Sequence, residues 1–78
     1  MTKSNTLGDA LPAQIARVTA KKERWQQMMR DNDMGPGMQF SINMMQLEIE
    51  RGVKALASGD VTEMLAAFRA LADYSDDD

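Results

Sequence analysis

The side chains that could do acid–base or nucleophilic chemistry are few and dispersed along this 78-residue chain. Histidine and cysteine are absent, so the sequence offers neither an imidazole base nor a Cys/His metal site. Glu48 and Glu50, two residues apart in a predicted helix, would point about 200° away from each other. Because catalysis needs convergent reactive groups, the sequence predicts a protein that is not an enzyme and has no cofactor.

The C-terminal tail contains the acidic run Asp76, Asp77 and Asp78. These carboxylates could bind a divalent cation weakly, but no loop geometry fixes the ligands there. We therefore expect residues 75–78 to form a solvated, disordered tail with no metal site.

A basic flank is formed by Arg17, Lys21 and Arg24, at positions i, i+4 and i+7 of a predicted helix, beside Met28. It could bind an acidic protein surface or nucleic-acid phosphates. It could also be a solvated face that pairs with the acidic second half of the chain. The net charge of −3 favours a protein partner, since nucleic-acid-binding domains are more often basic overall.

The element that presents this flank is a helix predicted from Asp9, as N-cap, to about Arg30, preceded by a flexible arm over residues 1–8. Its apolar positions recur at alternating spacings of four and three, which is typical of a helix–helix seam. The seam consists of Leu11, Ile15, Val18, Lys22, Trp25 and Met29. Its one polar member, Lys22, is expected either to extend its stem to water or to meet Glu48 or Glu50.

A break follows at residues 31–37, where Asx residues and Gly-Pro-Gly favour chain reversal. A second helix is predicted from Met38 to Ala57, and its main stripe consists of Met38, Ile42, Met45, Ile49, Val53 and Leu56. Gly52, at the edge of that stripe, would permit close approach. Folding the two helices as an antiparallel hairpin aligns Met29 with Ile42, Trp25 with Met45, Lys22 with Ile49, Val18 with Val53 and Ile15 with Leu56.

The second helix is also apolar on its opposite side, at Phe40, Met44 and Leu47. A helix with two apolar faces needs two partners, and a chain this short has little material to cover both. We therefore expect these three residues to form the interface of a homodimer.

A third helix is predicted from Val61 to about Tyr74, because Asp60 and Glu63 resemble a capping box and Ser58-Gly59 ends the preceding helix. Its apolar stripe comprises Val61, Met64, Leu65, Phe68, Leu71 and Ala72. Lys54 and Arg51 oppose its first turns on the outer side of the second helix, so it should settle toward the groove of the hairpin. Its acidic composition argues against a helix-turn-helix recognition role.

The expected fold is all-α: an antiparallel helical hairpin plus a shorter third helix, within a single domain over residues 9–74. No apolar run approaches the roughly 20 residues of a membrane span, and the N-terminus lacks the apolar core of a secretory signal. These features favour a cytoplasmic protein that does not enter membranes.

The segments "ALASGDVTEMLAAFRALADY" and "AKKERW" give residues 11–74 a general likeness to small helical proteins encoded among the early genes of temperate bacteriophages. Many of those proteins inhibit host regulators or defence complexes, so the resemblance implies a larger regulatory or defence protein as partner. The leading hypothesis is a non-enzymatic binding protein that sequesters or inhibits such a partner, using Arg17, Lys21, Arg24 and Met28. The alternatives are a DNA-associated regulator that uses the basic flank and a small assembly subunit.

Overall fold

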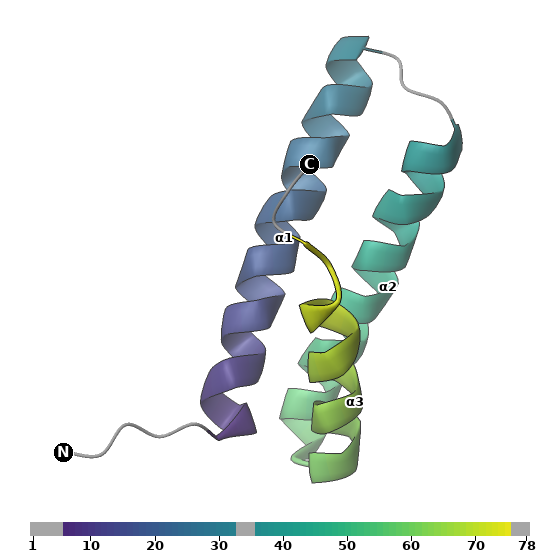
Figure 1. Ribbon diagram of the computed structural model, residues 1–78. Coiled ribbons are helices and arrows are strands. Elements are labelled where there is room, and N and C mark those ends of the chain that lie inside the picture. Colours follow the sequence, from purple (N-terminus) through teal and green to yellow (C-terminus); the bar gives the residue numbers. More distant parts are fainter. Residues whose placement is uncertain (1–5, 33–35, 76–78) are drawn as a thin grey trace, which may run out of the picture.

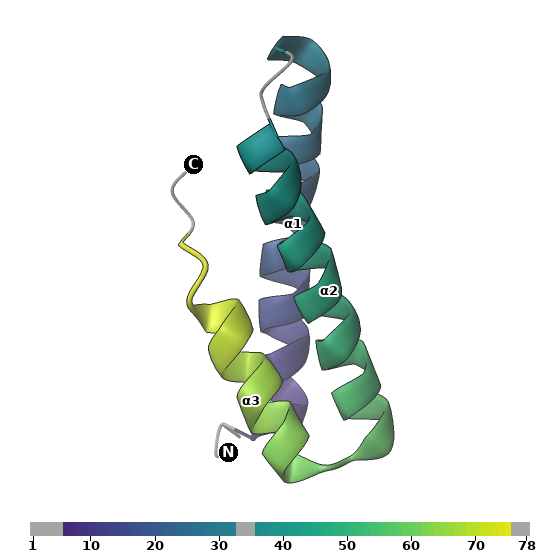
Figure 2. The ribbon, with the colours of Figure 1, turned by 90° about the vertical axis from the view of Figure 1, so that its right-hand side faces the viewer.

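In the computed structural model, which describes residues 6–32 and 36–75, these residues form three α-helices and no strand. α1 spans Leu7–Asn32, α2 spans Pro36–Ser58 and α3 spans Val61–Ala72. α1 and α2 run antiparallel, and α3 lies along the half of this hairpin that is remote from the connection (Figure 1 and Figure 2). Each helix packs against both others. The predicted all-α fold, a hairpin with a shorter third helix, is confirmed.

α1 begins at Leu7, two residues before the predicted N-cap Asp9. The carbonyl of Thr6 accepts from the amide of Ala10, and its hydroxyl contacts the Asp9 carboxylate at 3.4 Å. Thr6 therefore serves as N-cap, and Asp9 lies in the first turn, where the helix dipole favours an acid. The first five residues of the predicted arm, the connection 33–35 and the acidic tail 76–78 lie outside the described residues.

The alignment of α1 with α2 differs from the predicted one by about one turn. Ile15 lies against Gly52, one turn before the predicted Leu56, and the Lys22 ammonium donates to the side-chain oxygen of Gln46 at 2.7 Å. α1 ends at residue 32 and α2 begins at residue 36, so facing residues are equidistant from position 34. The predicted pairs were instead centred between residues 35 and 36. Each residue of α1 therefore faces a residue of α2 three or four positions earlier than predicted.

The core lies between the three helices and contains one lysine among apolar side chains. Its buried apolar members are Leu11, Val18, Ile42, Met45, Ile49, Ala55, Met64, Ala67 and Leu71. Val53, predicted in the hairpin seam, is instead 51% exposed, because the shifted alignment brings Gly52 to that layer. A Cβ on Gly52 would lie 3.3 Å from Ile15 and 3.5 Å from Leu71, so glycine lets both side chains pack close to α2.

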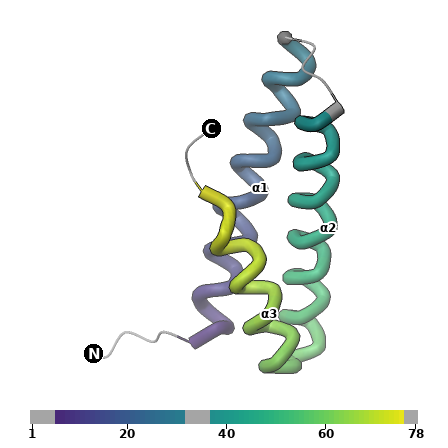
Figure 3. Tube along the Cα trace, turned by 45° about the vertical axis from the view of Figure 1, so that its right-hand side comes forward, coloured from purple at the N-terminus to yellow at the C-terminus, as the bar shows by residue number. Residues whose placement is uncertain are grey.

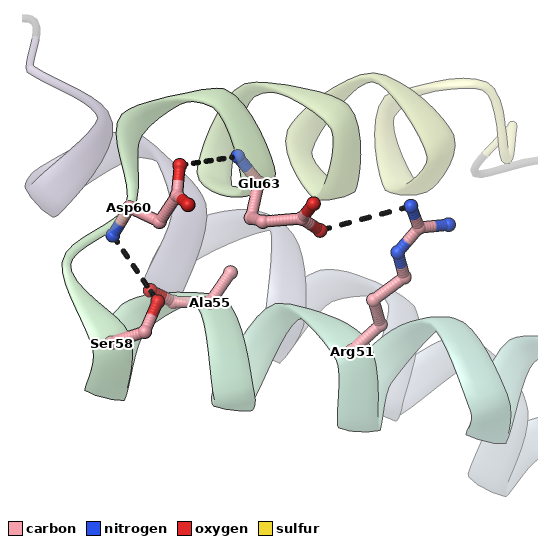
Figure 4. A network of polar contacts seen from close by, with 5 residues as sticks. All are labelled: Arg51, Ala55, Ser58, Asp60 and Glu63. Carbon is pink, nitrogen blue, oxygen red and sulfur yellow. Dashed lines mark hydrogen bonds and ion pairs between the residues drawn. The ribbon is translucent and has the colours of Figure 1, made fainter.

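In the α2–α3 turn, one of the two contacts of a capping box forms: the side chain of Asp60 caps α3, but the side chain of Glu63 points elsewhere. Gly59 has a φ of 72°, and the Asp60 carboxylate accepts from the Glu63 amide at 3.2 Å (Figure 4). The Glu63 carboxylate does not return to the cap: it approaches Arg51 at 3.8 Å, while the Asp60 amide donates to the Ser58 hydroxyl. The predicted N-cap is confirmed.

α3 presents a narrower buried face than its sequence predicts. Met64, Ala67 and Leu71, at i, i+3 and i+7, enter the hairpin groove, whereas Val61, Leu65 and Ala72 are exposed. The small side chain of Ala67 lets the helix approach closely, so the buried face centres on that residue. The predicted stripe was wrong for its three outer members, because one groove cannot cover so wide an apolar arc.

Candidate interaction surface

The outer stripe of α2, defined as Phe40, Met44 and Leu47, departs from an apolar-in, polar-out pattern. Phe40 is 67% exposed and Leu47 58% exposed, while Met44 is half-buried. The three residues recur at i, i+4 and i+7 and so follow one side of the helix. Neighbouring exposed apolar side chains of this kind commonly mark an interface.

The outer stripe is uncovered because α3 lies in the hairpin groove rather than on that side of α2, and because α3 is too short to reach the level of Phe40. With 12 residues it is about 18 Å long, against about 35 Å for the 23 residues of α2. The tube trace shows α3 beside only part of α2 (Figure 3). Tyr74, just beyond its C-terminus, hydrogen-bonds Glu48, one turn short of Met44 and two turns short of Phe40.

The Tyr74–Glu48 contact has an electrostatic consequence. Burial, the hydrogen bond to Glu48 and the charge of that carboxylate raise the pKa of Tyr74 to about 12. The raised value favours the neutral phenol in the folded chain. Its stabilising effect is complete below pH 10 and is lost as pH rises toward 12, so the contact is intact throughout the neutral range.

The basic flank, by contrast, is partly used inside the molecule. Arg17 donates from Nη2 to the carbonyl of Leu71 at 2.9 Å, and Lys21 donates from Nζ to the carbonyl of Ser75 at 2.6 Å. Leu71 lies in the last turn of α3 and Ser75 three residues beyond its end, and the C-terminus of a helix attracts cations. Two cations four residues apart on α1 therefore secure the end of α3.

Lys21 is 4% exposed, and its ammonium lies 5.1 Å from the centre of the Trp25 ring. The desolvation cost of burying this lysine is offset, because the ammonium donates to a carbonyl and lies near an aromatic ring. Lys22, the predicted seam lysine, is only half-buried and bonds Gln46, which in turn donates to Glu50. The sequence predicted Lys22 in the helix–helix seam and Lys21 on the outer flank, but in the structure Lys21 is the more deeply buried of the two.

The predicted partner-binding set is divided by this arrangement. Arg24 is exposed and Met28 is half-buried, whereas Arg17 and Lys21 contact the end of α3. Arg24 and Met28, the outer half of the predicted set, therefore lie on the part of α1 that extends beyond α3.

Sequence reasoning missed a second exposed apolar surface, on α3. Val61 is 66% exposed and Leu65 39% exposed. The available signal was the width of the apolar arc on α3, which exceeds what a single groove can bury.

The described residues enclose no pocket and bring together no cluster of metal-ligating side chains. Among these residues, no helix has both the length and the apolar character needed to cross a membrane. The described residues therefore define a three-helix protein whose candidate site is an exposed apolar surface. Comparison with protein-family models, curated proteins and solved structures finds no match to the chain.

Proposed function

We propose that this chain is a non-enzymatic protein-binding module that sequesters or inhibits a larger protein through its helical surface. The observation that supports a role in binding is the exposure of Phe40 and Leu47 on one side of α2, which we assign to self-association. Large aromatic and aliphatic side chains that lie together on a surface are typical anchors of protein interfaces. A regulatory or defence protein is the partner class that we propose.

In this proposal the outer stripe of α2 joins two copies of the chain. Phe40→Asp is expected to raise the dissociation constant of the dimer at least tenfold, about 1.4 kcal/mol, because it places a charge among apolar side chains. Sedimentation velocity across a concentration series measures this change. Val53→Asp is the matched control, since Val53 is a similarly exposed apolar residue on a different side of α2. A wild-type chain that stays monomeric throughout contradicts self-association.

The larger partner is proposed to bind the outer half of the predicted set, formed by the exposed Arg24 and the half-buried Met28. Arg24→Glu is expected to lower the amount of a specifically captured protein about tenfold, through loss of charge complementarity. The measurement compares immobilised wild type, Arg24→Glu and Arg30→Glu in capture from lysate. Arg30 is an exposed arginine on another side of α1, so it controls for net charge. Equal capture by all three chains contradicts a role for this flank.

A further inference from the structure

The outer stripe of α2 does not end at Leu47. Arg51 and Lys54 continue it with the same alternating spacing, and both are exposed. The outer side of α2 therefore has an apolar half toward its N-terminus and a basic half toward its C-terminus. A seven-residue spacing of this kind suits pairing with another helix.

The charges distinguish between the two directions in which a second copy could pair. In a parallel pair each Arg51 would face the other Arg51 and each Lys54 the other Lys54, so like charges would repel. In an antiparallel pair these positions move apart. If Met44 lies opposite Leu47 of the second copy, the four side chains at these positions meet in the centre of the contact, and each Phe40 lies one turn further out.

We propose that two copies associate through antiparallel pairing of their α2 helices, with Met44 against Leu47 and Phe40 against Arg51. This inference rests on the proposed self-association and adds its direction and register. The guanidinium of Arg51 then lies on the Phe40 ring of the second copy, which is a favourable cation–π contact. The pair that Arg51 makes with Glu63 is long and exposed, so shifting it costs little.

The flanking residues are compatible with the same register. Glu50 of one copy comes beside Gln39 and Asn43 of the other, whose amides are uncharged. Three apolar side chains per copy form a small contact compared with the ~800 Å² per partner of a standard interface. The dimer is therefore expected to dissociate on dilution.

Disulfide trapping tests this register, because the chain has no native cysteine. Phe40→Cys and Arg51→Cys are oxidised separately and as an equal mixture. The antiparallel register brings the two unlike positions together but separates the two copies of position 40 by about 16 Å along the helix axes, too far for a disulfide. We expect the mixture to form at least tenfold more disulfide-linked dimer than either variant alone. Val53→Cys is the off-stripe control.

A second pair leaves the outer stripe intact. Gln39→Cys mixed with Glu50→Cys, joined by a short bis-maleimide, should give the same preference for the mixed product. Efficient linking of Phe40→Cys or Gln39→Cys to itself would overturn the antiparallel register while leaving self-association in place. If neither mixture gave a linked dimer while the wild type was still dimeric by sedimentation, the dimer interface would have to lie outside the outer side of α2. A monomeric wild type would overturn both this inference and the proposed dimer.

Discussion

Leu71→Ala is expected to lower the free energy of unfolding by about 2–5 kcal/mol. The Leu71 side chain is fully buried and reaches the space beside Gly52, while the carbonyl of the same residue accepts the hydrogen bond from Arg17. Truncation leaves a cavity at the point where α3 meets both other helices. A domain of this size has a total stability of roughly 4–12 kcal/mol, so the loss is a large share of it.

Urea unfolding monitored by circular dichroism measures the effect, and Leu65→Ala is the matched control. Leu65 lies on the same helix and has the same side chain, but it is 39% exposed. Its truncation should cost under about 1 kcal/mol. Equal losses for the two variants would contradict the observed orientation of α3.

The helices themselves could be predicted because their signals are local. Asp60 accepts from the Glu63 amide as its position before an apolar run indicates, and Gly59 takes the positive φ that ends α2. The antiparallel arrangement of α1 and α2 agrees with the chain reversal predicted at residues 31–37, although the helices extend into that range, as far as Asn32 and from Pro36 onward. The order and approximate ends of the three helices follow from such short-range chemistry.

The alignment between helices was less predictable, since it depends on contacts across the fold. A shift of one turn preserves most apolar pairings, so the periodic pattern alone does not choose between registers. Gly52 decided the outcome, because it admits Ile15 and Leu71 where Val53 was expected. The same shift, together with the position of α3, buried Lys21 rather than Lys22.

The part of the candidate surface that depends only on the periodicity of a single helix could be predicted from the sequence. Phe40 and Leu47 oppose the hairpin seam whichever register the seam adopts, so their exposure follows from the period of α2. The exposure of Val61 and Leu65 depends instead on how α3 rotates in the groove. That rotation is set by the close approach of Ala67 and by Arg17 and Lys21, which are distant in sequence.

Lys21→Glu is expected to destabilise the fold by about 3–5 kcal/mol, because it places a carboxylate where the Ser75 carbonyl accepts a hydrogen bond. The C-terminus of α3 carries partial negative charge, so the new acid is repelled as well as buried. Lys21→Met retains the apolar stem, loses the donor and the ring contact, and introduces no opposite charge. Its cost should therefore be smaller, about 1–3 kcal/mol.

Thermal unfolding, monitored by the emission of the single tryptophan, measures this difference directly. The centre of the Trp25 ring lies 5.1 Å from the Lys21 ammonium, so its emission should change in both Lys21 variants. If Lys21→Glu were as stable as Arg24→Glu, Lys21 would have no part in securing α3. The distinction matters for the proposed function: loss of partner capture by Lys21→Glu would reflect a disturbed fold, whereas loss by a folded Arg24→Glu variant would locate the binding surface on α1.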